Sequence, residues 1–148
     1  MSNLIIRDIE DLVLPRFSDI KIGTFYKYQS LDSFRLKIDD HYFYDLKEEM
    51  TGVENYRAFV MTYKPSFDIK RSTVIYPREE IKRGDVCLIS GFCATHLAIK
   101  ISNNDLFDMW DNKIITLKNT DHEFEVPAGV CVNFIVDLKD AREMIHYE

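Results

Sequence analysis

Apolar and polar residues alternate with a period of two along much of this chain. Between Phe34 and Ile38, apolar residues alternate with Arg35 and Lys37, and the alternation recurs over residues 97–101. A period of two places successive side chains on opposite faces of a β-strand, so the pattern predicts a mainly β protein. The predicted strands cover residues 24–29, 34–38, 42–46, 56–63, 85–90, 96–101, 105–109, 113–117 and 130–136, with a short one within 122–127.

The segments between and beyond these strands are less regular. Residues 65–73 are rich in polar residues and are predicted to be a link. At the C-terminus, Asp137 is a suitable N-cap for a short amphipathic helix that carries Leu138 and Met144 on one face. Residues 4–14 fit either a helix or a strand, because their apolar spacing suits both.

Two stretches of the chain carry nearly the same order of residues. Residues 19–25 align with 80–86 at an offset of 61, and residues 36–46 align with 99–109 at an offset of 63. The second copy therefore has two extra residues, which fit a hairpin loop near Ser90. Gly23 and Gly84 occupy matching turns, where we expect positive φ. Self-similarity at a fixed period predicts an internal duplication.

The expected fold follows from the strands and the repeat together. It is mainly β, with a minor α+β contribution from the C-terminal helix. Two tandem small units, each an SH3-like β-barrel or a β-roll, are expected over residues 1–76 and 77–148. A unit of this size is at the edge of independent stability. Packing two copies as one compact body shares a core and covers sheet edges.

The repeated motif also supports a resemblance to a class of proteins. The copies read "DIKIG" then "LKIDDH", and "EIKRG" then "IKISNN". This unit resembles small β-barrel and β-roll accessory proteins of tailed phages, over residues 19–46 and 80–126. The resemblance implies a phage-encoded host-takeover or anti-defence factor that binds and blocks a host protein in the host cytoplasm.

Composition and charge narrow the range of partners. The chain has 148 residues, of which 46% are hydrophobic, and a formal net charge of −6. An acidic protein is poorly suited to long nucleic acid, because phosphate contacts need a basic surface. No apolar run approaches the length of a membrane span. The N-terminus has acids within its apolar stretch, unlike a signal peptide, so we expect a cytoplasmic protein without membrane contact.

Aromatic residues gather in the first copy and are the main candidates for binding. Either the two copies, or two chains in a homodimer, cover these rings, or the rings form an exposed patch for a partner protein. An alternative is a small-ligand protein that sequesters a nucleotide signal, with Arg35, Lys37 or Arg57 near its phosphate. The predicted binding residues are Tyr26, Tyr28, Arg35, Lys37, Tyr42, Tyr44 and Trp110.

One segment has an enzyme-like feature. The stretch "RGDVCLISGFCATHLAIKI" resembles part of the NlpC/P60-type cysteine hydrolases, and this resemblance would make His96 the general base. Cys93 and Cys131 are the cysteines that such an activity would involve. A nucleophilic cysteine needs a lowered pKa, typically at a helix N-terminus, and no such element precedes His96. The hydrolase is therefore a second alternative to a non-enzymatic binding protein without catalytic residues.

Metal and cofactor sites are not predicted. Cys87, Cys93, His96 and Cys131 are ligand types that suit zinc, but they lack a paired C-x2-C spacing. We expect free thiols in a reducing compartment. The sequence contains no phosphate-binding glycine motif, so no nucleotide cofactor is expected.

Overall fold

The computed structural model describes residues 14–28, 32–71, 75–76, 81–90, 95–117 and 124–136. These residues form two antiparallel sheets and one short 3-10 helix, η2 (Phe17–Asp19), so the mainly β prediction is confirmed. Among them no helix has the length and apolarity needed to cross a membrane. The predicted C-terminal helix and the ambiguous N-terminal segment up to residue 13 lie outside the described residues.

The first sheet has six strands in the order β12-β5-β1-β2-β3-β4. Four short strands form a meander, and two long strands extend the sheet on the other side of β1. Its strands are β1 (Phe25–Lys27), β2 (Arg35–Lys37), β3 (Tyr42–Asp45), β4 (Met50–Val53), β5 (Met61–Lys70) and β12 (Gly129–Val136).

The second sheet repeats the meander in the order β10-β9-β8-β7-β11-β6. Its strands are β6 (Ile75–Tyr76), β7 (Val86–Ser90), β8 (Thr95–Lys100), β9 (Asp105–Asp108), β10 (Lys113–Thr116) and β11 (Phe124–Glu125). We call β1–β4 the first meander and β7–β10 the second meander. Nearly all their strands lie at predicted positions; only β4 was not predicted.

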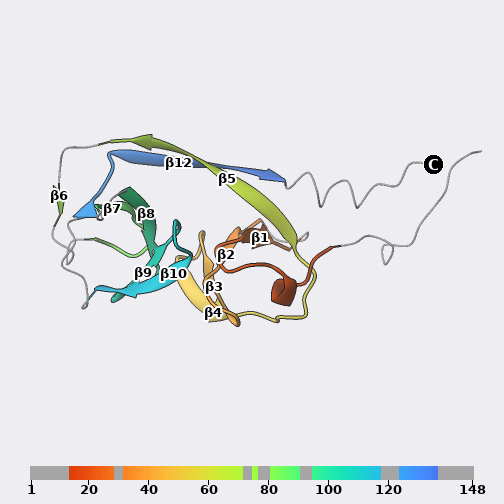
Figure 1. Cartoon of the computed structure of the whole chain (residues 1–148). Coiled ribbons are helices and arrows are strands. Elements are labelled where there is room, and N and C mark those ends of the chain that lie inside the picture. The colour runs from red at the N-terminus through yellow and green to blue at the C-terminus, as the bar shows by residue number, and fades with distance from the viewer. Residues whose placement is uncertain are drawn as a thin grey trace, which may run out of the picture.

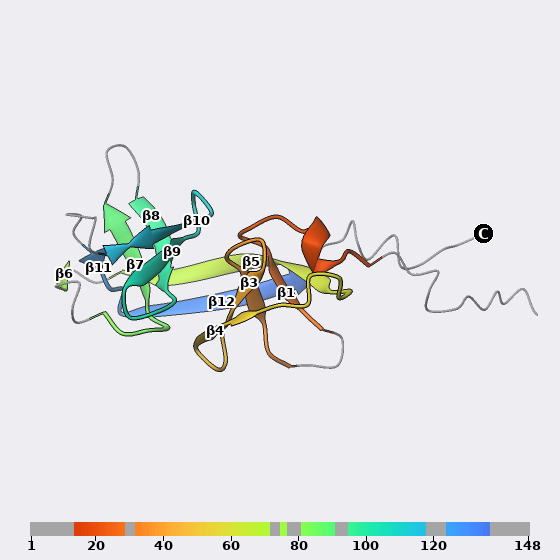
Figure 2. The same cartoon turned by 90° about the horizontal axis from the view of Figure 1, so that it is seen from below.

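A long two-stranded ribbon joins the two meanders. β5 and β12 pair antiparallel from Tyr63 opposite Val136 to Lys70 opposite Gly129. The ribbon passes along both meanders, which lie at its opposite ends (Figure 1), and the view from below shows the same arrangement (Figure 2).

The prediction of a polar link over residues 65–73 is wrong for its first part, because β5 continues to Lys70. Its polar residues Ser66, Asp68 and Lys70 are exposed. Phe67, on the other face, packs against the core.

The core lies between the two meanders and under the ribbon. Phe25, Leu36 and Tyr44 from the first meander pack with Ile99 and Phe107 from the second. Partly buried aromatic side chains of both ribbon strands complete this cluster. The two halves of the chain therefore share this apolar cluster.

The two meanders also share details of backbone geometry. The amide of Gly23 donates to the carbonyl of Lys37 at 2.7 Å, and the amide of Gly84 donates to that of Lys100 at 2.8 Å. Both glycines have positive φ, as predicted, at 95° and 92°. Each glycine also lies against the hairpin turn of the other meander, at Asn112 for Gly23 and at Glu49 for Gly84.

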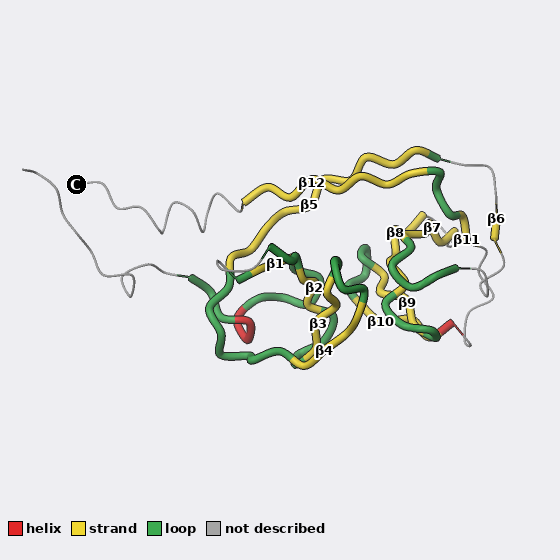
Figure 3. The backbone as a smooth tube through the Cα atoms, turned by 180° about the vertical axis from the view of Figure 1, so that it is seen from behind, coloured by secondary structure: helices red, strands yellow, loops and turns green. Residues whose placement is uncertain are grey.

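Neither sheet closes on itself, so the predicted barrel architecture is wrong. The first sheet ends at β4 and β12, and the second ends at β10 and β6. Strand β5 continues past β1 to pair with β12 instead of returning to β4, as the backbone trace makes clear (Figure 3). The body is therefore a pair of open sheets joined by a ribbon.

Candidate functional site

The predicted binding residues of the first meander are divided between core and surface. Tyr26, Lys37 and Tyr44 are buried, whereas Tyr42 is exposed. Both faces of this sheet are covered, because η2 and Val60 pack on one face and the second meander packs on the other. The three buried side chains are therefore not on the surface that a partner would meet.

Tyr26, Tyr28 and Arg35 converge on the buried carboxylate of Glu54. The Tyr26 hydroxyl donates to Glu54 Oε2 at 2.6 Å, the Tyr28 hydroxyl donates to Oε1, and Arg35 Nη1 donates to Oε2 at 2.8 Å. Burial, and then the bond to Glu54, raise the pKa of both tyrosines. Burial alone would lower the pKa of Arg35, but Glu54 outweighs it and the pKa is raised. The positive charge of Arg35 is thus balanced by Glu54 within the protein.

Lys37 has two structural partners in the segment before Gly23. Its Nζ donates to the carbonyl of Phe17 at 2.9 Å and to that of Ile20 at 2.8 Å. Burial lowers its pKa. Lys100, at the matching position of the second meander, donates to the carbonyl of Ile81 in the same way. Both lysines therefore fasten the segment before the glycine turn to the sheet.

Tyr44 differs from Tyr26, because its hydroxyl has no hydrogen-bond partner among the described residues. Burial raises the pKa of Tyr44 to about 12. The matching residue of the second meander is Phe107, which fills the same shared core without a hydroxyl.

Exposed apolar side chains gather around the free edge of the first meander. We call Tyr42, Val53, Tyr56 and His41 the edge patch. Tyr42 faces Val53 across β3 and β4, and the ring of His41 lies 5.8 Å from that of Tyr56. Tyr42 is 48% exposed, Val53 70% and Tyr56 43%. No described strand pairs with the outer side of β4.

The same place in the second meander is polar. At the offset of 63 residues, Asp105 matches Tyr42 and Thr116 matches Val53, and the two residues of each meander lie directly opposite each other across its two strands. The Thr116 hydroxyl donates to Asp105 Oδ1 at 3.2 Å. The scaffold therefore accepts a polar, hydrogen-bonded pair at this position, and the apolar pair of the first meander is not required by the fold.

His96 and Trp110 come together in the second meander, at the start of β8 and in the turn after β9. His96 Nδ1 lies 2.8 Å from Asp108 Oδ2 and 3.8 Å from Asp111 Oδ2. The hydrogen bond to Asp108 raises the pKa of His96. Trp110 stacks on the imidazole with 5.8 Å between ring centroids and is 67% exposed. The sequence predicts His96 as a candidate base and Trp110 as a candidate binding residue, but it does not predict that their rings are in contact.

The cysteines do not complete a hydrolase site within the described structure. Cys87 is buried, and burial raises the pKa of its thiol to about 12, so it stays protonated near neutral pH. Cys131 is exposed on β12, and Cys93 lies outside the described residues. Neither Cys87 nor Cys131 hydrogen-bonds to His96, which bonds to Asp108 instead. The hydrolase therefore stays a prediction without a described nucleophile–base pair.

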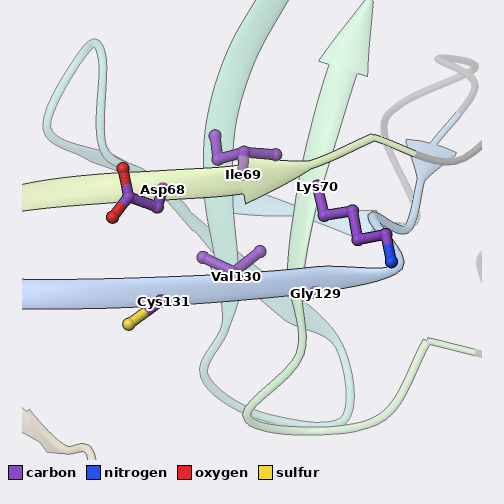
Figure 4. Close-up of a pocket in the computed structure, with 6 residues that line it drawn as sticks. All are labelled: Asp68, Ile69, Lys70, Gly129, Val130 and Cys131. Carbon is purple, nitrogen blue, oxygen red and sulfur yellow. The ribbon is translucent and has the colours of Figure 1, made fainter.

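A hollow of about 510 Å³ lies at one end of the ribbon (Figure 4). Its size is within the range of small-ligand sites. The residues that line it come from only two neighbouring strands: Asp68, Ile69, Lys70, Gly129, Val130 and Cys131. This lining includes no aromatic ring on which a base would stack, so it does not strengthen the nucleotide alternative.

The chain was compared with protein-family models, curated proteins and solved structures, and no match was found. The candidate sites therefore rest on the geometry described above.

Proposed function

We propose that this protein is a non-enzymatic binding module that binds and blocks a partner protein through the edge patch. The observation that carries the proposal is the contrast between the two meanders. Tyr42 and Val53 are exposed and apolar, whereas the matching Asp105 and Thr116 are polar and bonded to each other. Exposed apolar side chains that cluster at one place are typical of interaction sites.

The free edge beside the patch supports the same function. Edge strands attract further strands, and proteins commonly protect them with charged residues, especially lysine. β10 begins with Lys113, whereas β4 reads Met-Thr-Gly-Val and carries no charge. The first meander therefore leaves its edge open where the second protects it.

The chemistry of the edge indicates the kind of partner. An extended segment can add to β4 as a further strand, with backbone hydrogen bonds for affinity and alternate side chains for specificity. Apolar side chains on that segment would lie against Tyr42 and Val53. We propose that the partner is a host protein in the cytoplasm, as the resemblance to phage accessory proteins implies.

We infer that the two meanders arose by internal duplication. Matching hydrogen bonds at Gly23 and Gly84, and positive φ at both Glu49 and Asn112, support this origin. The offset of 63 relates Glu49 to Asn112 as it relates the matching strands. The second meander can therefore serve as an internal control for the first.

The proposal is tested by placing the second meander's pair in the first. The measurement is the amount of host protein that stays bound to the tagged chain when it is purified gently from host lysate. We expect the wild-type chain to retain one host protein in stoichiometric amount. The double variant Tyr42→Asp with Val53→Thr should lose at least about 90% of it, because an interface depends on a few buried apolar anchors. Equal retention by this variant would contradict the edge patch as the interface.

A matched control uses an exposed apolar residue of the other edge strand. Ile114→Thr on β10 removes an exposed apolar side chain from the equivalent edge. We expect it to retain the partner as the wild type does. Equal loss in both variants would contradict a patch confined to the first meander.

A further inference from the structure

A buried carboxylate in the second meander lacks the cation that its counterpart has. Asp45 lies 3.4 Å from Arg35 Nε, and the matching Asp108 is only 2% exposed. Ala98 stands where Arg35 stands in the first meander. A buried charge is costly unless it is paired or binds a metal. Asp108 Oδ1 accepts from the amides of Trp110 and Asp111, but among the described residues only His96 is a partner of opposite charge for this carboxylate.

Three ligand atoms lie close together at this carboxylate. His96 Nδ1, Asp108 Oδ2 and Asp111 Oδ2 are all within 4.8 Å of one another. Metal–ligand distances of about 2.0–2.2 Å place neighbouring ligand atoms of a tetrahedral ion about 3.3 Å apart. The two carboxylate oxygens lie 2.8 Å and 3.8 Å from the imidazole nitrogen, on either side of that value.

We propose that His96, Asp108 and Asp111 form a binding site for a divalent transition-metal ion such as Zn²⁺. One imidazole nitrogen and two carboxylate oxygens suit Zn²⁺, Co²⁺ or Ni²⁺, whereas an imidazole ligand is unfavourable for Mg²⁺ and Ca²⁺. Asp111 is partly exposed, so solvent supplies the remaining ligand positions. Lys113 Nζ, 3.8 Å from Asp111, is exposed and can move aside.

The described residues of the first meander contain no such set. Ser33 stands where His96 stands, and its hydroxyl donates to Asp45 at 2.5 Å. Glu48 stands where Asp111 stands, and Arg35 already pairs with Asp45. The matching turn of the first meander therefore forms without an imidazole, so His96 is not needed for the fold of the second meander.

The only tryptophan of the chain reports on this site. Trp110 stacks on His96, so a paramagnetic ion bound to the imidazole would quench its fluorescence. In the metal-free full chain, we expect Co²⁺ to quench Trp110 saturably with one ion per chain. Excess Zn²⁺ should displace Co²⁺, and Mg²⁺ should have no effect. Absence of saturable quenching would overturn the proposal.

Two variants test whether Co²⁺ binds at this site and not at other metal-ligating residues of the chain. His96→Ser places the first meander's residue beside Asp108, so the hairpin keeps a hydrogen bond while the nitrogen ligand is lost. Asp111→Asn removes one charged ligand. Both should weaken Co²⁺ binding by more than about tenfold, because even groups that only orient ligands account for about 10–100-fold. Unchanged Co²⁺ affinity in both variants would overturn the proposal.

Controls in the first meander keep the test specific. His41→Ser and Glu48→Gln change an exposed histidine and the residue that matches Asp111. Both should bind Co²⁺ as the wild type does. The edge-patch double variant should also bind Co²⁺ normally, so this proposal and the proposed function fail separately.

Discussion

Single side chains differ most between the two meanders where polar groups are buried. Glu54, Arg35 and Tyr26 form a hydrogen-bonded cluster in the first meander. The matching residues of the second are Leu117, Ala98 and Cys87, which belong to an apolar cluster. A buried polar network is stable only when each of its members has a partner. The first meander therefore depends on polar contacts that the second does not need.

Tyr44→Phe should stabilise the protein. The Tyr44 hydroxyl is buried without a hydrogen-bond partner, and such a group costs about 1–3 kcal/mol. We expect urea unfolding to give a free energy of unfolding about 1 kcal/mol higher in the variant. Phe107→Tyr, the reverse change at the matching position, should lower it. A less stable Tyr44→Phe variant would mean that the hydroxyl has a partner.

Asp45 should make stability depend on pH in the acid range. Burial opposes its ionisation, but the amides of Glu48 and Lys47, the Ser33 hydroxyl and Arg35 outweigh it, so its pKa is lowered. A lowered folded-state pKa gives stability that is present above the unfolded-state value of about 3.9 and is lost as pH falls through the folded-state pKa.

Asp45→Asn therefore tests this contribution. We expect the variant to be about 1–3 kcal/mol less stable at pH 7, because it weakens several charge-assisted bonds. Its stability should also fall less steeply below pH 4. The exposed Asp68→Asn is the control and should follow the wild-type curve. Parallel curves for Asp45→Asn and the wild type would contradict the account.

Turns and strands show how much of the fold could be predicted from sequence. Gly23 and Gly84 were expected at positive φ, and the polar turns after β2 and β8 lie where the sequence placed them. β4 was missed because Met-Thr-Gly-Val is short and lacks alternation. Residues 65–70 were assigned to a link because Pro65 and polar residues hid the alternation. Pairing between distant strands, as in the ribbon, leaves no local signal.

The candidate sites could be predicted only in part. Tyr42 and Trp110 were chosen as aromatic residues and are exposed. Tyr26 and Tyr44 were chosen for the same reason, but both faces of their sheet are covered. Val53 and Asp111 carried no signal of their own, because their importance comes from neighbours brought close by folding. Exposure depends on tertiary contacts that the spacing of residues does not encode.

The glycine turns should be sensitive where they meet the other meander. A Cβ on Gly23 would lie 2.1 Å from Asn112 Oδ1, and its φ of 95° is unfavourable for alanine. We expect Gly23→Ala to cost about 2 kcal/mol or more in the free energy of unfolding, measured with urea. Gly129→Ala is the control, because a Cβ there meets no atom within 4 Å. Equal stability of both variants would contradict the close approach at Gly23.

The whole molecule is held together by the shared core and the ribbon. Ile99 and Phe107 pack against Leu36 and Tyr44, and β12 pairs with β5. We therefore expect both halves to unfold in one cooperative transition. Trp110 fluorescence reports on the second meander, and far-ultraviolet circular dichroism reports on all strands. Their urea transitions should coincide, and separate midpoints would contradict a shared core.

The division of roles between the meanders is the central claim at this scale. One edge is open and apolar at β4, and the matching edge at β10 is protected by charge and a polar pair. Hydrogen–deuterium exchange on the chain, alone and with its retained partner, tests this division most directly. We predict slower exchange at residues 50–53 in the complex and unchanged exchange at residues 113–116. Protection at 113–116 with none at 50–53 would contradict the account.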